Sequence, residues 1–284
     1  MFCNQCEQAA KGTGCATTPG VCGKDEDVQS LQEMLLFGVK GMCAYAHHAR
    51  RLGYTDPEVD EFVERALFST MTNVNFDLGG MLELNLEAGR MNLKVMAMLD
   101  KAHTETYGAP RPAVVKEGTQ AGHGILITGH DMKNLEMLLK ACEGTDVKVY
   151  THGEMMPAHM YPKLGDHPNL VGHYGDAWQK QRGDFTRFPG AIIANTNCVV
   201  IPREAYRDRM FSINPVAVPG SQQIDEKDLS IVVEKALALP HAEDDIVGES
   251  TIGFHHSVIA SKLDAVLDAV KAGDLRHVFL IGGC

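Results

Sequence analysis

Apolar residues recur at three- and four-residue steps through the first part of the chain, from about residue 25 to residue 107. Such steps place the apolar side chains on one face of an α-helix. Gly53 is suited to end a first helix, while Asp56 and Pro57 are suited to cap and begin a second one. A third helical pattern begins at about Leu78. Its apolar stripe consists of Leu82, Leu86, Leu93, Met96 and Leu99. We therefore predict a small three-helix bundle.

The pattern changes after Pro110 and Pro112, where short apolar runs begin to alternate with helical stretches. This alternation predicts a parallel β-sheet that is flanked by helices. The expected strands are Gly124–Thr128, Val147–Thr151, Ala191–Asn195 and, directly after it, Cys198–Ile201. The expected helices cover residues 131–142 and a stretch that runs from about residue 225 through residue 236.

The last part of the chain has the pattern of one αβ unit. A polar linker is expected at residues 243–249, followed by a helix over residues 256–272 and a strand at Val278–Ile281. One such unit cannot form a sheet alone. We therefore expect it either to extend the preceding sheet or to open a further domain.

Composition narrows the class of protein. The 284 residues give room for about two domains, and the 44% hydrophobic and 22% charged fractions are those of a globular protein. No run approaches the roughly 18 to 20 apolar residues that a membrane span needs. The net charge of −11 argues against a nucleic acid as partner, because phosphate binding draws on an excess of Lys and Arg.

Four of the eight cysteines lie within the first twenty-two residues, at Cys3, Cys6, Cys15 and Cys22. Four thiolates in one segment are typical of a site for a soft metal. Structural zinc usually takes two close cysteine pairs, whereas only the first pair is close here, so the spacing favours an iron–sulfur cluster over zinc. No secretion signal is visible, so we expect a reducing cytoplasm rather than disulfides.

Chemically reactive residues follow several of the predicted strands. His130 follows the first strand, His152 and Glu154 follow the second, Cys198 follows the third, and Cys284 follows the last. Because ligands bind outside the carboxyl ends of parallel strands, these side chains are expected to converge on one mixed N, O and S ligand set, which suits iron. Each has an alternative role: a histidine that caps a helix, an acid at a helix start, or a buried thiol.

Several motifs along the whole chain resemble the hybrid cluster protein family, whose members are also called prismane proteins or hydroxylamine reductases. The motifs that carry the resemblance are residues 1–8, 13–15, 21–24, 127–131, 150–155, 196–198 and 282–284. The resemblance implies a [4Fe–4S] cluster on the four N-terminal cysteines. It also implies a hybrid [4Fe–2O–2S] cluster with His130, Glu154 and Cys198 among its ligands, and Cys284 as a cysteine that is modified to a persulfide. His152 belongs to the motif but is not implied as an iron ligand.

The resemblance also implies an activity. Hydroxylamine would be reduced to ammonia and water at the hybrid cluster, where Glu154 is a displaceable ligand and His130 a borderline one, with electrons arriving from a redox donor protein through the N-terminal cluster. Reduction of nitric oxide and peroxide chemistry need the same open iron and stay open. A different class of function, an electron carrier or redox sensor, would need only the four N-terminal cysteines.

The chain departs from the family pattern in two ways. It lacks the second helical bundle of the longer members, as the shorter members do, and it stops where the family continues with two further cysteines and a glutamate. We therefore expect a fragment that cannot hold a normal hybrid cluster by itself. The predicted fold is a multidomain α+α/β protein. Its expected parts are an iron–sulfur segment at residues 1–24, a helical bundle at 25–110, a Rossmann-like parallel α/β domain at 111–245, and the start of a second α/β domain at 246–284.

Overall fold

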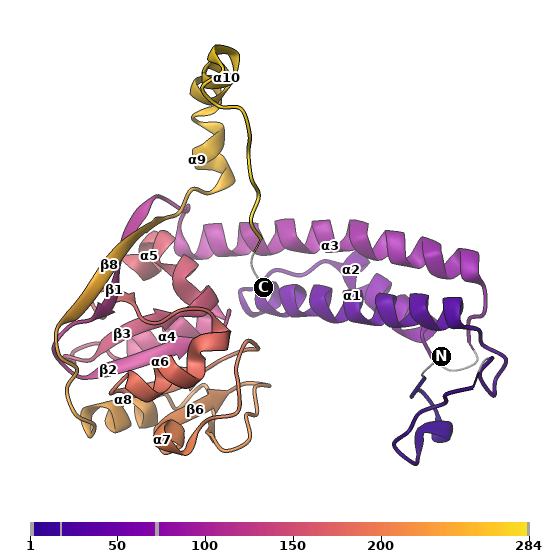
Figure 1. Cartoon of the computed structure of the whole chain (residues 1–284), viewed down its shortest axis with the longest axis horizontal. Helices are drawn as coiled ribbons and strands as arrows, with labels where there is room; N and C mark the ends of the chain where they lie inside the picture. The colour runs from indigo at the N-terminus through magenta and orange to yellow at the C-terminus, as the bar shows by residue number, and fades with distance from the viewer. Residues whose placement is uncertain (1–2, 18, 72–73, 283–284) are drawn as a thin grey trace. The chain divides into compact units, whose positions relative to one another are not determined.

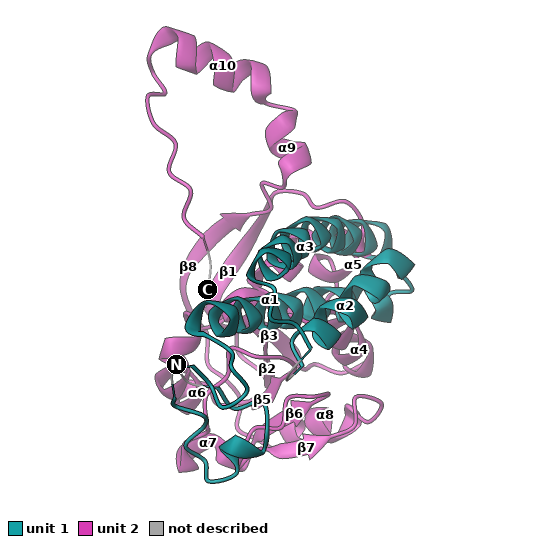
Figure 2. Cartoon of the chain, turned by 90° about the vertical axis from the view of Figure 1, so that its right-hand side faces the viewer, with its two compact units in different colours: residues 1–106 teal, residues 107–284 magenta. Residues whose placement is uncertain are grey.

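A computed structural model describes residues 3–17, 19–71 and 74–282. The chain divides into two compact units, residues 1–106 and residues 107–284, which Figure 2 shows in different colours. The four-part division expected from the sequence is finer than this one and stays a prediction.

The first unit contains the three predicted helices, preceded by a short 3₁₀ helix, η1 (Glu7–Ala9). The helices are α1 (Glu26–Arg51), α2 (Pro57–Ser69) and α3 (Leu78–Tyr107), labelled in Figure 1. The Asp25 side chain accepts a hydrogen bond from the backbone N–H of Val28, and the Asp56 side chain accepts one from that of Glu58, so each acid caps its helix. Buried residues from all three helices form one core, among them Leu35, Phe62 and Met81. The predicted three-helix bundle is confirmed.

The predicted buried face of α3 is wrong. Leu82, Leu86 and Leu93 are exposed, and the side chains that α3 buries in the core are Met81, Ala88 and Val95. This helix is apolar on two faces, so periodicity alone does not select the face that packs on the bundle.

The second unit is built on an eight-stranded sheet within the described residues. Its strands are β1 (Ala113–Thr119), β2 (Gly124–Thr128), β3 (Lys148–His152), β4 (Leu170–His173), β5 (Ala191–Ala194), β6 (Met210–Ile213), β7 (Gln222–Ile224) and β8 (Asp245–Ile252). Their order is β7-β6-β5-β2-β3-β4-β1-β8, and each neighbouring pair is parallel except β1 with β8. The predicted parallel sheet is confirmed.

Helices and 3₁₀ turns connect the strands. They are α4 (Met132–Ala141), η2 (Gly153–Met160), α5 (Pro162–Gly165), η3 (Trp178–Lys180), α6 (Gln181–Arg187), α7 (Glu204–Arg207) and α8 (Ser230–Leu237). Asp131 caps α4 by accepting hydrogen bonds from two backbone N–H groups. The central strands β2 and β5 have every residue buried, which is typical of a parallel sheet covered on both faces.

Two expectations for this unit are wrong. Residues 198–201 form no strand, and the expected polar linker at residues 243–249 belongs largely to β8. Strand β8 pairs antiparallel with β1 along the sheet edge, with Glu249 opposite Lys116. An edge strand keeps one side in solvent, so a polar sequence can form it without an apolar signal.

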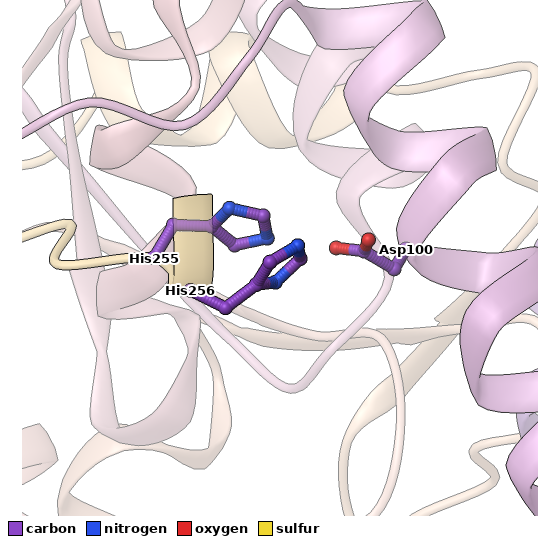
Figure 3. Close-up of side chains that lie close together, drawn as sticks. All are labelled: Asp100, His255 and His256. Carbon is purple, nitrogen blue, oxygen red and sulfur yellow. The ribbon is translucent and has the colours of Figure 1, made fainter. Parts of the chain in front are cut away.

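The last segment also differs from the expected αβ unit. The helix expected over residues 256–272 is two helices, α9 (His256–Ala260) and α10 (Leu263–Ala272). His255 caps α9, and its ring lies against that of His256 with centroids 3.8 Å apart (Figure 3). Residues Val278–Ile281 form no strand, and they are almost fully exposed. Without a neighbouring strand in the described part of the chain, their backbone groups have no ladder to join.

Within the described ranges, none of the helices combines the length and apolarity that a bilayer crossing requires.

Candidate metal centre

Three neighbouring strands end level with one another. Thr128, at the end of β2, pairs with His152 of β3 and with Ala194 of β5. Because the strands are parallel, the residues that follow each of them emerge at the same edge of the sheet. This register explains how segments distant in the sequence meet in one site.

Three of the predicted site residues meet at this edge. One ligand atom each from His130, Glu154 and Cys198 lies within 4.8 Å of the others. His130 Nε2 and Glu154 Oε2 are 2.5 Å apart, and Cys198 Sγ lies 3.8 Å from the same Oε2 atom. The structure therefore brings an imidazole, a carboxylate and a thiol together. That they bind iron stays a prediction.

A cavity of about 590 Å³ opens beside these three side chains. His152, His173 and Trp178 contribute to its wall. Most of the side chains that line the cavity are polar or titratable, and Met156, Ala177 and Trp178 add apolar surface.

His130 is held by two residues that follow β5. The buried Asn195 side chain accepts a hydrogen bond from the His130 backbone N–H at 3.1 Å and donates one to the Asp131 carbonyl at 2.9 Å. Thr196 Oγ1 lies 2.7 Å from His130 Nδ1, which leaves Nε2 directed at Glu154. Metal-binding histidines commonly have their second ring nitrogen fixed in this way.

The turn before His130 requires glycine. Gly129 has a φ of +127°, and a Cβ atom there would lie 2.7 Å from Thr196 Oγ1 and 2.8 Å from the Thr196 backbone nitrogen. Both the conformation and the space therefore exclude a larger side chain.

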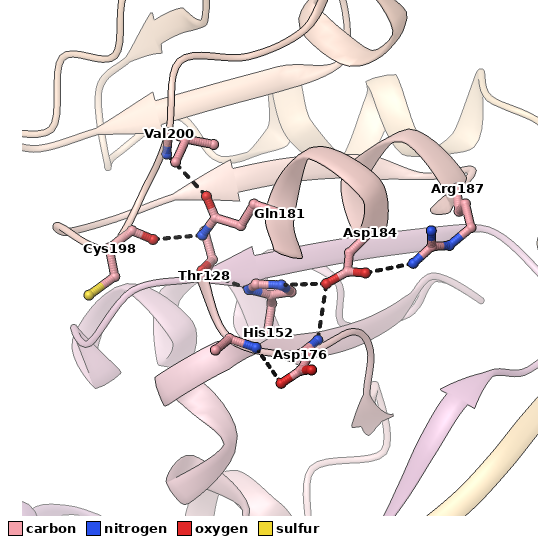
Figure 4. Close-up of polar contacts among 9 residues, drawn as sticks. Thr128, His152, Asp176, Gln181, Asp184, Arg187, Cys198 and Val200 are labelled. Atoms are coloured by element: carbon pink, nitrogen blue, oxygen red, sulfur yellow. Dashed lines mark hydrogen bonds and ion pairs between the residues drawn. The ribbon is translucent and has the colours of Figure 1, made fainter. Parts of the chain in front are cut away.

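His152 is part of the cavity wall but does not belong to the group of His130, Glu154 and Cys198. Its Nε2 is 3.4 Å from Asp184 Oδ2 and its Nδ1 is 3.2 Å from Thr128 Oγ1 (Figure 4). Since the carboxylate only accepts, Nε2 carries the proton and Nδ1 accepts from the Thr128 hydroxyl. Burial lowers the pKa of His152, which the nearby Asp184 partly opposes.

The sequence alone does not mark the residues that support the site. The sequence marks Asn195 only as the last residue of a predicted strand and Thr196 only within the motif at residues 196–198, and it does not mark Gln181 or Asp184 on α6. Asn195 and His130 are 65 positions apart, and Asp184 and His152 are 32 apart. No local pattern marks such pairs, because the sheet topology brings them together.

The four N-terminal cysteines form a separate cluster candidate in the first unit. Cys3 and Cys15 pair through two backbone hydrogen bonds, of 3.1 and 2.6 Å, while Cys22 is exposed. A hydrogen bond from the Thr17 hydroxyl is the main cause that lowers the pKa of the Cys15 thiol, with backbone hydrogen bonds and the charge of Lys24 adding to it. The part of the chain that the structure describes does not bring three of these thiols as close together as His130, Glu154 and Cys198.

Lys24 connects this segment to the helical bundle. Its buried ammonium donates to Cys3 Sγ at 3.4 Å, to Gln5 Oε1 at 3.1 Å and to Gln32 Oε1 of α1 at 2.7 Å. These three contacts hold the cysteine segment against α1. The last predicted site residue, Cys284, lies outside the described residues.

Comparison with known proteins gives a family match along the chain. The family model described as Prismane/CO dehydrogenase family matches residues 1–84 and 77–284. A protein from Moorella thermoacetica named "Hydroxylamine reductase" is 55% identical over 284 residues, and one of the same name from Thermotoga petrophila is 52% identical over 285. Each alignment covers 100% of this chain and 66% of the relative, so the chain spans about two thirds of the relatives' length.

A solved structure has a similar fold. The Ni-free carbon monoxide dehydrogenase from Thermococcus sp. AM4 superposes with a TM-score of 0.69, over 95% of this chain and 61% of that one. At 16% sequence identity this likeness concerns the fold alone.

Proposed function

This chain belongs to the Prismane/CO dehydrogenase family, and we propose that it forms the greater part of an iron–sulfur oxidoreductase that reduces hydroxylamine. Two electrons and two protons are added, the N–O bond is broken, and the products are ammonia and water. The observation that carries the proposal is the convergence of His130, Glu154 and Cys198 beside a cavity at the strand ends. The name of the relatives in Moorella and Thermotoga supports the choice of substrate.

The three side chains fit a hybrid iron–sulfur–oxygen cluster by their chemistry. The thiol of Cys198 is a soft donor, the imidazole of His130 a borderline one and the carboxylate of Glu154 a hard one, a combination that suits iron in a mixed sulfur and oxygen environment. When bound, the cluster supplies electrons and an open iron position for cleavage of the N–O bond. The persulfide-forming role of Cys284 belongs to the same proposal.

Other residues of the chain position these donors. The Thr196 contact fixes the His130 ring, and the 2.5 Å contact between His130 Nε2 and Glu154 Oε2 supports the proposal that both side chains serve one centre. Glu154 would hold the cluster through a hard oxygen, and among the three side chains it would be the one most readily exchanged for substrate. The cavity of about 590 Å³ readily admits a molecule as small as hydroxylamine.

Electrons would enter through a [4Fe–4S] cluster on Cys3, Cys6, Cys15 and Cys22. The segment offers four thiols, and the ammonium of Lys24 next to Cys3 Sγ supports a negatively charged cluster. A redox donor protein and a cytoplasmic location are parts of this proposal.

The test uses the full-length protein, purified without oxygen. We expect more iron per chain than one [4Fe–4S] cluster supplies, and oxidation of a reduced dye that depends on hydroxylamine. About four irons per chain with no turnover would contradict the proposal and indicate an electron carrier or redox sensor instead. A higher kcat/KM for nitric oxide or peroxide than for hydroxylamine would assign a different substrate.

Glu154→Ala tests the site itself. We expect turnover to be abolished while the spectrum of the N-terminal cluster stays unchanged. The matched control is Glu143→Ala, because Glu143 is an exposed glutamate outside the cavity wall. Full turnover in the Glu154 variant would remove this residue from the mechanism.

A further inference from the structure

Cys198 has an unusual backbone conformation. Its φ is +62°, in the left-handed region that residues with a side chain rarely adopt. The residues after it, 199–203, belong to no strand or helix, so no ladder of backbone hydrogen bonds holds this segment. Another group must fix the main chain if the Cys198 thiol is to stay beside Glu154.

The side chain of Gln181 supplies that group. Gln181 is the first residue of α6 and is 0% exposed. Its Nε2 donates to the Cys198 carbonyl at 2.6 Å, and its Oε1 accepts from the Val200 N–H at 3.1 Å (Figure 4). One amide thus holds the chain at two points, one at Cys198 and one just beyond it.

Helix α6 is itself anchored to the site. Asp184, one turn after Gln181, accepts a hydrogen bond from the Asp176 backbone N–H at 3.0 Å and pairs with His152 at 3.4 Å. Arg209 of the loop before β6 donates to the carbonyl of Phe185 at 2.7 Å. The helix therefore connects the end of β3 to the segment that carries Cys198.

From these contacts we infer that Gln181 is a positioning residue for the proposed metal centre. By fixing the main chain at Cys198 in the left-handed conformation, it holds the thiol 3.8 Å from Glu154 Oε2. The inference rests on the proposed function, since it concerns the ligand geometry of the same centre. It adds a residue that acts on the centre through the main chain of Cys198.

Two variants of the full-length protein test the inference. Gln181→Met keeps the length of the side chain and removes both hydrogen bonds. Gln181→Glu keeps the acceptor for Val200 but places an oxygen against the Cys198 carbonyl. Gln179→Leu is the control, because Gln179 is an exposed glutamine two positions earlier. The measurements are iron content, the electron paramagnetic resonance spectra of both clusters, melting temperature and turnover of hydroxylamine.

In both Gln181 variants we expect an altered or lost signal from the second cluster and an unchanged signal from the N-terminal one. Turnover should fall about tenfold or more. A loss of transition-state stabilisation equal to the contribution of one hydrogen bond lowers a rate by about this factor. The control should match the wild type. A lower melting temperature with wild-type spectra and turnover would mean that Gln181 serves only the fold, and would overturn the inference. If Gln181→Met does not accumulate as folded protein, Gln181→Glu decides by the same criteria.

Failure of this inference is distinguishable from failure of the proposed function. A wild-type protein without a second cluster signal would contradict the proposed function itself. A wild-type protein with that signal, and Gln181 variants that retain it unchanged, would contradict only the role of Gln181.

Discussion

Acid should destabilise the α/β unit through a histidine that is buried in its neutral form. His159, in η2, has its Nε2 3.0 Å from Thr151 Oγ1. Burial lowers its pKa from 6.5 to about 4, and a hydrogen bond with the backbone of Gly172 opposes this shift only in part. The folded chain therefore resists protonation at a site where the unfolded chain accepts a proton.

The sign and size of the effect follow from this difference. A group whose pKa is lower in the folded state contributes its full stability above the unfolded pKa of 6.5, and that stability is lost as the pH falls toward about 4. The difference between the unfolded and folded pKa values of His159 corresponds to about 3 kcal/mol of unfolding free energy. About 2 kcal/mol of this is lost between about pH 7.5 and about pH 5. His173 adds to the trend, since burial also lowers its pKa, to about 3.

Replacing His159 with Gln isolates this contribution. Glutamine does not titrate, yet it can bond to Thr151 as the imidazole does. The measurement is urea unfolding at several pH values, followed by the fluorescence of Trp178, the chain's single tryptophan, which lies in the same unit. We expect the loss of stability between neutral and acidic pH to be about 2 kcal/mol smaller in the variant than in the wild type. The control is His277→Gln at an exposed histidine. Equal pH dependence in the His159 variant and the wild type would refute the reasoning.

Three further substitutions have defined outcomes. Gly129→Ala should lower the free energy of unfolding by about 1 to 3 kcal/mol, measured in urea, because φ is +127° there and Asn195 leaves no room for a Cβ atom; wild-type stability would contradict the close approach. Lys24→Met should lower the midpoint potential of the proposed N-terminal cluster in a redox titration, because the ammonium beside Cys3 Sγ favours the more negative reduced state; an unchanged potential would remove Lys24 from redox tuning. Arg209→Met should cost about 2 kcal/mol or more of unfolding free energy, because two buried backbone carbonyls lose their charged donor; a smaller loss would show that water replaces it.

The sequence was sufficient to predict where the candidate site lies. The strand Gly124–Thr128 has the predicted bounds, because a run of buried apolar residues before a glycine and a capping acid is a strong local signal. The position of His130 then follows from a general property of parallel sheets, whose ligands bind at the carboxyl ends of strands. The same property of parallel sheets places Glu154 and Cys198 at that edge. Once the three strands are predicted, the residues that follow them are expected to lie close together.

The edge strand β8 and its neighbour β1 were not predictable in the same way. Strand β1 contains Lys116 and Glu117, and strand β8 is mostly polar, so neither has the apolar run that marks β2. What stabilises them is a ladder between segments more than a hundred positions apart, with Ser250 donating a hydrogen bond to Glu117 across it. Such pairing depends on the rest of the sheet being in place, and periodicity does not record it.

The residues around the site are even harder to predict from the sequence, because their contacts also join segments that are far apart in it. Asn195, Gln181 and Asp184 are buried polar side chains, and each would destabilise the fold if its partners were absent. Their partners are backbone and side-chain groups at the strand ends, and together they fix His130 and Cys198 while leaving those two side chains partly open to the cavity. The energy that orders the site is thus supplied by groups that are engaged in hydrogen bonds around it and are not among the three converging side chains. Substitutions in these groups should therefore change the geometry of the proposed centre before they unfold the sheet, because β2, β3 and β5 keep their own apolar core.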